Sequence, residues 1–423
     1  MLSLNKVTIV QTITLIFALS FARGQDRKIN ATLYPGCQVC TENDTLVYIR
    51  AEGAHNTIHQ LWDFTGGMPL VILTVAGVNS TMNITWDHTT PVKFSISEQP
   101  KYSFATAIDK LYEYDDIHDN GYIDEKVPKR SVDLWRATWW PHSMVLTDQE
   151  VMVQLRGHVN DYGRSGTIDI KLDMLPFQDY AAELPHLIHT ANSTLLDVSL
   201  VNFTTSPDYN ASRYALNLLM VSQDSSNSTM TTTVRKSLDD EHTPGIFEIV
   251  EVESPRSSSG PGAYVQFRPV AYRQRARDVA SSTRARPSVP ARTRIPEHST
   301  LRAFYRGVDP STLLVQNMRI SFGEPGDGFY AHHNYTAWSA SLGGLRAGGA
   351  GAAAAAGRRL RLRQRAPPAR PVSAGAPAPV SRLTNLDGKH GCFVAENRRC
   401  HWMISMLRVQ RANCISIDAF QDK

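Results

Sequence analysis

The stretch Asp116–Asp124 spaces its polar side chains in the way that a calcium-binding loop spaces its ligands. An aspartate and Asn120 occupy the first and fifth positions of such a loop, and Gly121 occupies the sixth, where the backbone must turn sharply. His118 stands at the third position, and Val127 stands where a bidentate glutamate closes the site. Because the missing glutamate removes two oxygen ligands, we interpret this stretch as a solvated acidic turn that does not respond to calcium.

Two further clusters contain groups that could take part in acid–base or metal chemistry. The run Asp239-Asp240-Glu241-His242 could supply paired carboxylates for glycoside hydrolysis. That reaction needs two carboxylates about 5 to 9 Å apart across a cleft, whereas adjacent residues of one turn point in different directions. His332 and His333 could bind a metal or act as a base, but neighbouring residues rarely point at one atom. The sequence also lacks G-x-S-x-G, H-E-x-x-H and a phosphate-binding glycine loop, so it predicts no catalytic site, no metal and no cofactor.

Cysteines are few for a secreted chain, and they are Cys37, Cys40, Cys392, Cys400 and Cys414. The C-x-x-C spacing of the first two fits a redox pair, half of a metal site or a local disulfide. The flanking residues predict a loop rather than the helix N-terminus that a redox pair uses, and no second pair stands at a zinc-ligand spacing. We therefore predict a structural disulfide between Cys37 and Cys40, or participation of the two cysteines in separate bridges.

Residues 1–24 have the features of a secretory signal peptide. Lys6 provides the positive start, Val7–Phe21 is apolar, and Ala22-Arg23-Gly24 offers the small residues of a cleavage site. The apolar run of about 15 residues is shorter than the roughly 20 that a membrane span requires. The mature chain is therefore expected to begin near Gln25 in the lumen of the secretory pathway.

Glycosylation signals agree with that compartment. One Asn-x-Ser/Thr sequon arises easily by chance, but many of them behind a signal peptide jointly indicate a luminal or extracellular glycoprotein. All of them lie between Gln25 and Leu342, and several fall where turns are expected, so they should mark the outer edges of the sheets. The nine predicted acceptors are Asn30, Asn43, Asn79, Asn83, Asn192, Asn202, Asn210, Asn227 and Asn334.

The net charge of +4 hides two different compositions. Residues 343–423 contain fourteen Lys/Arg and four Asp/Glu, or +10, which leaves 30 basic and 36 acidic residues, or −6, for residues 1–342. An acidic, sequon-rich body is thus followed by a basic segment without sequons. The basic overall balance is therefore no indication of a nucleic-acid partner.

Residues 25–342 predict an all-β region of antiparallel sheets packed as a sandwich. Ile168, Ile170, Leu172 and Met174 alternate with polar residues, which is typical of a strand with one buried face. Pro69–Ala76 is a continuous apolar run that suits a central strand buried on both faces. Because this region is long for one sandwich, we expect two β-rich lobes, 25–178 and 179–342, divided near Pro176–Pro185.

One hairpin is predicted in detail. Ile246–Val252 is an apolar strand after the turn at Pro244-Gly245, and Tyr264–Tyr272 returns beside it after a Ser/Pro/Gly-rich loop. Pro269 predicts an edge position or a bulge in the second strand, because proline cannot donate to the ladder. The other strand candidates have the same Asn/Gly/Pro/Ser punctuation, and they are 46–49, 82–86, 151–155, 195–203, 214–221 and 313–322, with 102–114 either a helix or a bent strand.

Two segments depart from the β pattern. Residues 273–298 are rich in Arg, Ala, Ser and Pro, which predicts a long disordered or poorly packed loop. Residues 343–423 begin with a Gly/Ala run followed by arginines, and this low-complexity basic tail is expected to be disordered or the product of a wrong exon prediction.

Several blocks of sequence resemble the glycosylated lysosomal membrane protein family, in the order in which that family has them and over roughly residues 45–342. The blocks are Arg50-Ala51, Asn56-Thr57-Ile58-His59, Leu187–Ala191, Ser237–Glu241 with Pro244 and Phe247, Gln266–Tyr272, Phe322-Gly323, Gly328-Phe329-Tyr330 and Tyr335–Ser339. The resemblance implies a lysosomal type I membrane glycoprotein with a large luminal domain and no known catalytic activity. It also implies an accessory subunit that binds a lysosomal major-facilitator-superfamily dipeptide transporter and protects it from proteolysis, with a homodimer as a possible state.

Two other classes of function stay open at this point: a lysosomal or secreted glycoside or peptide hydrolase, and a secreted adhesion-type β-sandwich. A deep cleft with facing carboxylates would favour the first, and presence of the protein in the medium without a lysosomal pool would favour the second. In the family a membrane span follows the position of Leu342, but residues 343–423 contain no apolar run of about 18 residues. As written, the chain is expected to be soluble in the lumen or secreted, and we expect the natural transcript to continue from Leu342 into an apolar helix and a short tail.

Overall fold

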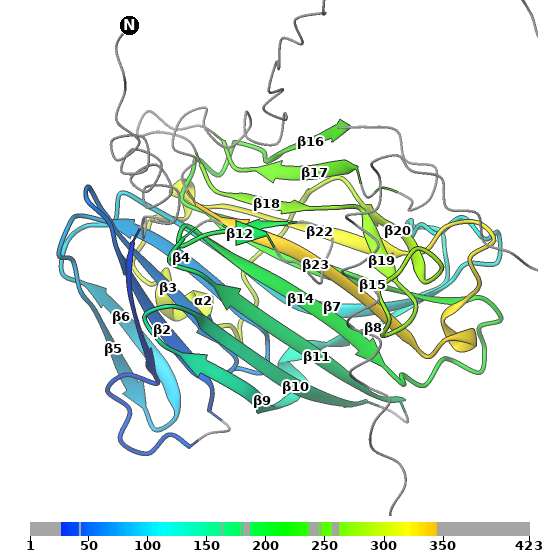
Figure 1. Cartoon of the computed structure of the whole chain (residues 1–423), viewed down its shortest axis with the longest axis horizontal. Coiled ribbons are helices and arrows are strands. Elements are labelled where there is room, and N and C mark those ends of the chain that lie inside the picture. The colour runs from blue at the N-terminus through cyan, green and yellow to red at the C-terminus, as the bar shows by residue number, and fades with distance from the viewer. Residues whose placement is uncertain are drawn as a thin grey trace, which may run out of the picture. The chain divides into compact units, whose positions relative to one another are not determined.

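Antiparallel β-strands make up most of the regular structure in the computed structural model of this chain (Figure 1). The structure describes residues 27–41, 44–161, 164–177, 179–180, 187–236, 245, 247–255 and 262–344. Nineteen of the described strands form one continuous hydrogen-bonded sheet that folds back on itself, so that two faces pack against each other. The all-β, sandwich-type prediction is confirmed.

The first face contains the early strands and two later ones. Its hydrogen-bonded order is β1-β2-β3-β4-β7-β15-β22, and β8 pairs with the half of β7 that extends beyond β4. The bounds are β1 (Lys28–Leu33), β2 (Leu46–Glu52), β3 (Thr57–Asp63), β4 (Leu70–Ala76), β7 (Tyr102–Asp115), β8 (Lys129–Asp133), β15 (Ser212–Ser222) and β22 (Leu314–Phe322).

The second face has the order β9-β10-β11-β14-β23. The other side of β23 pairs with both β18 and β19. β17 then pairs with β18, and β16 pairs with β17. The bounds are β9 (Thr138–Leu146), β10 (Val151–Asp161), β11 (Arg164–Met174), β14 (Ser193–Val201), β16 (Thr231–Lys236), β17 (Glu248–Glu253), β18 (Tyr264–Phe267), β19 (Val270–Tyr272) and β23 (Tyr335–Gly343).

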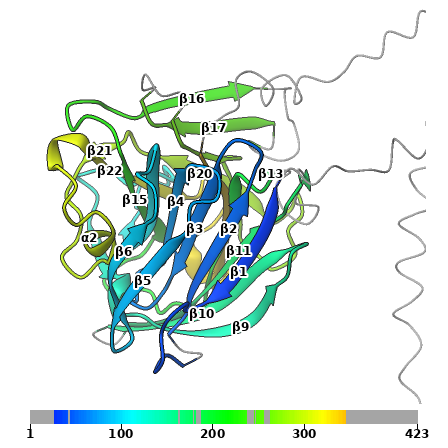
Figure 2. The same ribbon diagram turned by 90° about the vertical axis from the view of Figure 1, so that its left-hand side faces the viewer.

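A short strand joins the two faces. β20 (Ser282–Pro287) pairs with β19 on one side and with β22 on the other, while β21 (Ala291–Arg292) pairs with β22 further along. At the opposite border β1 and β9 lie beside each other, so the sheet is nearly closed (Figure 2).

The remaining elements are small. They are the hairpin β5 (Met82–Asp87) and β6 (Thr90–Ile96), the strand pair β12 (Asp179–Tyr180) and β13 (Ile188–His189), the helix α2 (Thr300–Phe304), and the 3₁₀ turns η1 (Leu134–Arg136), η2 (Pro310–Thr312) and η3 (Tyr330–His332).

The main core lies between the two faces. Trp62, Leu111 and Leu216 from the first face pack in the same cluster as Leu196 and Trp338 from the second. Ile168, Ile170, Leu172 and Met174 on β11 are each at most 1% exposed, so the predicted alternation of this strand is confirmed. Removing such side chains from water is the dominant favourable term for a sheet of this kind.

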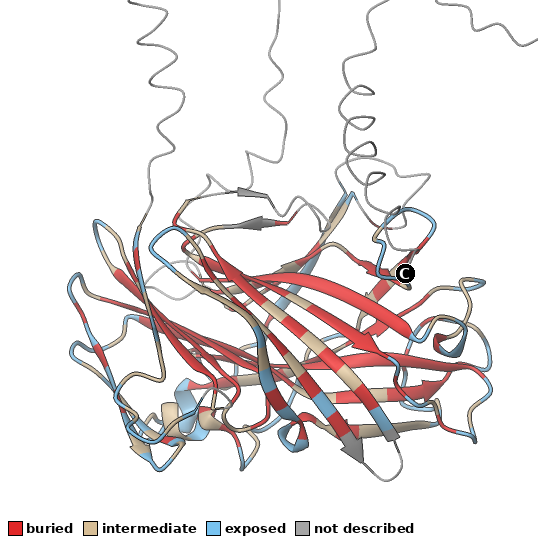
Figure 3. Ribbon diagram, turned by 60° about the horizontal axis from the view of Figure 1, so that its bottom comes forward, coloured by how far each residue is buried: buried red, intermediate tan, exposed pale blue. Residues whose placement is uncertain are grey.

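A second core covers the outer side of the first face. Leu61, Ile72 and Leu219 point to this side and pack with Ile84 of the β5–β6 hairpin and with Leu301 of α2. β3, β4 and β15 are consequently buried along their whole length, and Figure 3 shows such central strands as continuous red bands. The prediction that Pro69–Ala76 contains a strand buried on both faces is confirmed by β4.

The prediction of a disordered loop over 273–298 is wrong, because this segment contains β20 and β21. Its low apolar content misled the interpretation. Ala285 and the small side chains before it are buried, and Arg284 is held by the carboxylate of Glu248 at 2.8 Å. Backbone pairing and charge pairing thus order a segment whose composition alone predicts disorder.

The predicted division into lobes near Pro176–Pro185 does not separate the strands. β11, before that position, pairs with β14 after it, and β7 pairs with β15 along eleven registered positions from Ser212↔Asp115 to Ser222↔Phe104. The residues near the predicted boundary pair locally as β12 and β13. The large sheet therefore contains strands from both sides of that position.

The structure also decides the predictions for residues 102–114 and 246–272. Residues 102–114 form a strand, β7, whose register against β15 shifts at Asp109. The 246–272 hairpin is present as β17 and β18, and Pro269 lies in the break between β18 and β19 rather than at an edge. The predicted tail 343–423 lies outside the described residues except for Gly343 and Gly344.

Replacing Ile170 with Asp should lower the free energy of unfolding by more than about 3 kcal/mol, because the new carboxylate would be buried without a partner. The neighbouring Asp169→Asn weakens only a pair with the half-exposed Arg156 and should cost at most about 1 kcal/mol. Denaturant unfolding of both variants measures the difference. Equal tolerance of the two substitutions would contradict the position of β11 in the main core.

Candidate functional site

The stretch that resembles a calcium loop is occupied by an arginine. Arg213, the second residue of β15, is buried, and its Nε donates to Asp116 Oδ2 at 2.8 Å. Asp116 also accepts hydrogen bonds from the backbone amides of Asn120 at 2.9 Å and Gly121 at 2.7 Å. The interpretation as a solvated acidic turn is therefore wrong for Asp116, which is 2% exposed.

The same guanidinium holds a second loop. Its Nη1 donates to Asp327 Oδ1 at 2.6 Å and to Gly328 O at 3.1 Å, and the ring of Phe329 lies 4.9 Å from Arg213 Cζ. Burial acts to lower the pKa of Arg213, but the charge of Asp327 and its hydrogen bond outweigh it, so the pKa is raised above its ordinary value. Arg213 stays charged and fastens the loop after β7 to the loop after β22.

This arrangement leaves no position for calcium at Asp116, since the cation there is already the guanidinium. Across the described residues the structure shows no group of three or more His, Cys, Asp or Glu side chains that could hold a metal ion. His332 is exposed, and burial followed by the charge of Arg273 lowers the pKa of His333. The Asp239–His242 run lies outside the described residues.

Among the described residues, the buried pair of His59 and Ser80 most resembles the histidine base and serine nucleophile of a hydrolase. His59 Nε2 lies 2.8 Å from Ser80 Oγ, and His59 Nδ1 lies 2.8 Å from the Tyr48 hydroxyl. Ser80 Oγ, however, donates to Gly77 O at 2.9 Å, so its proton points away from the imidazole. His59 and Ser80 are both fully buried. A serine nucleophile must donate to its base and be open to substrate, so this arrangement is a structural hydrogen-bond chain.

Burial, and after it the charge of Arg50, lowers the pKa of His59 to about 4. His59 is therefore neutral in the folded protein over most of the physiological range. It joins β3 to β2 through Tyr48 and to the β4–β5 turn through Ser80.

The predicted glycosylation sites lie mainly on exposed edges and turns. Asn43 lies outside the described residues, and Asn192 is half-buried, with its Oδ1 accepting from Arg27 Nε. Asn79, Asn202 and Asn334 have positive φ angles of 71°, 53° and 52°, which asparagine tolerates in tight turns. The exposed sequon asparagines are Asn30, Asn79, Asn83, Asn202, Asn210, Asn227 and Asn334.

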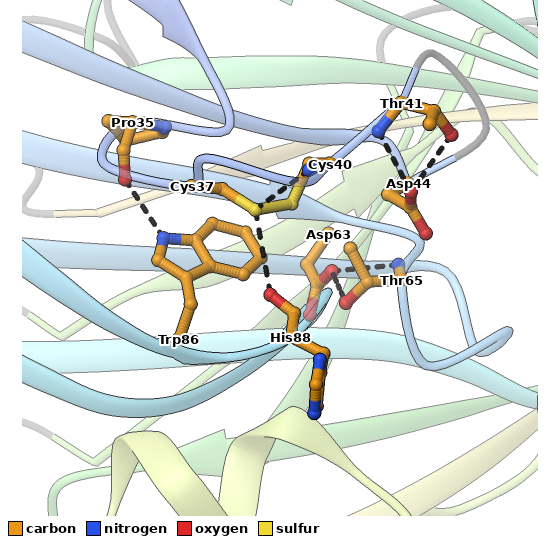
Figure 4. The surroundings of a disulfide bond; sticks show 9 residues. All are labelled: Pro35, Cys37, Cys40, Thr41, Asp44, Asp63, Thr65, Trp86 and His88. Atoms are coloured by element: carbon orange, nitrogen blue, oxygen red, sulfur yellow. Dashed lines mark hydrogen bonds between the residues drawn. A yellow bond between two sulfur atoms is a disulfide. The ribbon is translucent and has the colours of Figure 1, made fainter.

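Cys37 and Cys40 are joined by a disulfide in the loop between β1 and β2, with a Cα–Cα distance of 5.7 Å (Figure 4). The loop rests on the β5–β6 hairpin, because Trp86 Nε1 donates to Pro35 O at 2.9 Å and Cys37 Sγ lies 3.6 Å from His88 O. The backbone amide of Cys40 donates to Cys37 Sγ at 3.1 Å. The bridge closes so short a loop that it fixes local shape and adds little to global stability.

Sequence reasoning missed Arg213. The sequence did contain one signal, namely a single charged residue at the start of the largely apolar β15. The structure explains this charge, because Arg213 is buried and pairs with Asp116 and Asp327. Among the described residues no helix is long and apolar enough to cross a membrane.

Comparison with known proteins identifies relatives over most of the described region. The family model described as "Glycosylated lysosomal membrane protein" matches residues 45–345. Glycosylated lysosomal membrane protein A of Xenopus laevis is 24% identical over 345 residues, which cover 76% of this chain and 82% of the relative. The Danio rerio protein is 28% identical with 75% and 80% covered, and the Homo sapiens protein is 25% identical with 78% and 82% covered. These relatives are named as membrane glycoproteins and not as enzymes.

Replacing Arg213 with Met should lower the free energy of unfolding by about 3–5 kcal/mol, because Asp116 and Asp327 would stay buried without their cation. Arg156→Met is the matched control and should cost at most about 1 kcal/mol, since its pair with Asp169 is half-exposed. Thermal unfolding with and without calcium adds a second readout. An increase of the melting temperature on adding calcium would contradict occupation of the loop by Arg213.

His59 should make the protein less stable as the pH falls. A histidine takes up a proton near pH 6.5 in the unfolded chain, whereas His59 in the folded protein does so only near pH 4. The contribution of neutral His59 to the free energy of unfolding is therefore fully present above about pH 6.5 and is lost below about pH 4. Denaturant unfolding at about pH 7 and about pH 4.5 should show a loss on the order of 2 kcal/mol from this group. His59→Gln should reduce that loss, whereas His142→Gln, at an exposed position, should not. An unchanged loss in the His59 variant would refute this assignment.

Proposed function

The chain belongs to the glycosylated lysosomal membrane protein family, and from that membership we propose that it acts without catalysis as an accessory subunit of a lysosomal transporter. The transporter is a major-facilitator-superfamily carrier of dipeptides, which this protein binds and protects from proteolysis. The β-sheet region lies on the luminal side of the membrane, and membrane attachment and a homodimer are parts of the same proposal.

The observation that carries the proposal is the placement of the sequons. Seven sequon asparagines are exposed, and they lie on β1, at the β4–β5 turn, on β5, after β14, at both ends of β15 and before β23. Glycans at these positions would project from several edges and turns of the sheet, with Asn202 and Asn334 beside each other. Such a layer would keep luminal proteases away from the protein and from a partner bound beside it.

The backbone supports the same role. The described loops contain many backbone hydrogen bonds, including the long loops after β1, β7 and β22, and the central strands are buried on both sides. Proteases need a flexible segment that fits their active site in an extended form, and few described segments offer one. A stable, glycan-covered sheet suits a protective subunit in a compartment rich in hydrolases.

The two alternative functions have no specific observation in their favour among the described residues. A hydrolase needs a nucleophile or paired carboxylates open to substrate, while the His59–Ser80 pair is closed and points the serine proton elsewhere. The adhesion alternative rests on the sandwich architecture alone, which many unrelated functions share.

Loss of the protein should shorten the half-life of the transporter severalfold in a protein-synthesis chase of cells. Re-expression should restore it, and a variant with Asn→Gln at the seven exposed sequons should restore it only in part, because the glycan layer is missing. Asn120→Gln, at an exposed asparagine outside any sequon, is the control and should restore it fully. A transporter that is equally stable without this protein would exclude the protective role.

A further inference from the structure

A large open groove lies between the β5–β6 hairpin and the segment that runs from β21 through α2 to the start of β22. It has a volume of about 1220 Å³, and its walls include Thr90, Arg294, His298 and Arg306. Figure 2 shows β21, α2 and β6 along the same side of the sheet. The volume exceeds the roughly 300–1,000 Å³ of ordinary small-molecule sites, so the groove is sized for a length of chain.

The walls of this groove are strongly basic. They contain four arginines, Arg292, Arg294, Arg302 and Arg306, against a single acidic residue, Glu297. This excess stands out because residues 1–342 as a whole carry a net charge of −6, from 30 basic and 36 acidic residues. Clustering of one charge sign along a concave surface concentrates the electrostatic potential there and attracts ligands of the opposite sign.

Two of the four arginines are available to a ligand. Arg292 is engaged with the backbone carbonyls of Ser226 and Ser228, and Arg302 forms only a loose, exposed pair with Glu297 at 3.7 Å. Arg294 and Arg306 are exposed, and no described residue forms a hydrogen bond or an ion pair with either side chain. Guanidinium groups in this state are suited to bind carboxylates in a bidentate manner.

The floor of the groove is apolar. Val92, Ile295, Val308 and Val315 are half-buried there, and Leu313 is almost fully buried. Among the described residues β6 pairs only with β5, and β21 pairs only with β22, so each has one strand edge without a neighbouring strand. Apolar floor positions and free strand edges are features that recognise an extended polypeptide.

Other occupants fit these features less well. The segment 343–423 of this chain carries +10 and would be repelled by the arginines. A sulfated polysaccharide would satisfy the arginines, but it has no apolar side chains to cover the floor. Carboxylates that alternate with apolar side chains satisfy both, because alternate residues of an extended chain point to opposite sides.

We propose that this groove is the docking site for an extended, acidic polypeptide segment of the partner protein, with apolar side chains on the floor and carboxylates on Arg294 and Arg306. The inference rests on the proposed function in one respect, namely that the segment belongs to the luminal part of the transporter.

The first experiment tests the groove alone. The glycosylated full chain is titrated with a fluorescent synthetic peptide of about 12 residues in which glutamate alternates with valine. We expect saturable binding that weakens as salt rises, because exposed charges are screened. The double variant Arg294→Glu/Arg306→Glu should lose at least about tenfold in affinity, which is about 1.4 kcal/mol. The control Arg275→Glu/Lys126→Glu makes the same change of net charge at exposed positions elsewhere and should bind normally.

Several outcomes of this titration would overturn the proposal. One is equal binding of the peptide by the groove variant and the control variant. Another is tighter binding of a heparin-derived oligosaccharide, or of a glutamate-only peptide, which would make the groove a general polyanion site. A third is a change from dimer to monomer caused by the groove substitutions, which would make the groove a contact between two copies. Matching melting temperatures of the two double variants ensure that loss of binding is not loss of folding.

The second experiment separates this inference from the proposed function. The transporter is co-purified from lysosomes with the unsubstituted protein and with each double variant. If the unsubstituted protein fails to retain the transporter, the proposed function fails and the peptide titration still decides the groove. If the groove variant retains the transporter as well as the control does, the docking inference fails while the proposed function stands.

Discussion

The structure depends on the burial of its first sheet face on both sides. β3, β4 and β15 have no solvent-facing side, so a polar or charged side chain on them is removed from water and is stabilised by a partner inside the protein. This constraint explains the internal hydrogen bonds of His59 and the paired charges of Arg213. It also explains why the β5–β6 hairpin and α2 are needed, because without them the outer apolar surface of this face would lie in water.

The features that could be predicted from the sequence are those that arise from periodicity within one element. The alternation around Ile170 and the continuous apolar run before Ala76 each report on the surroundings of one strand, and both predictions are confirmed. That β20 forms an ordered strand could not be predicted in this way. Its side chains are small or charged, and it is held by pairing with two other strands, β19 and β22. The basic groove was hidden for the same reason, since its arginines fall partly in the segment whose composition predicted disorder.

Local motifs proved unreliable where their completion depended on distant residues. The Asp116–Asp124 stretch has several features of a calcium loop, but the group that occupies it comes from the start of β15. A search for local motifs cannot find that arginine, because it lies 97 residues away from Asp116 in the sequence. In contrast, the Cys37–Cys40 prediction needed only residues within one loop, and the structure contains that bridge.

The place of β23 has a consequence for how the chain is made. β23 is the last described strand, yet it lies in the middle of the second face, between β14 on one side and β18 and β19 on the other. During synthesis of the chain, the earlier strands therefore keep open edges until nearly all of the β region has been made. The backbone amide of Asn202 donates to Asn334 O at 2.8 Å, so this contact between two sequons also forms only at the final stage. In the proposed luminal location, this delay would give the glycosylation machinery access to an incomplete sheet, and glycans attached in that interval would cover its open edges.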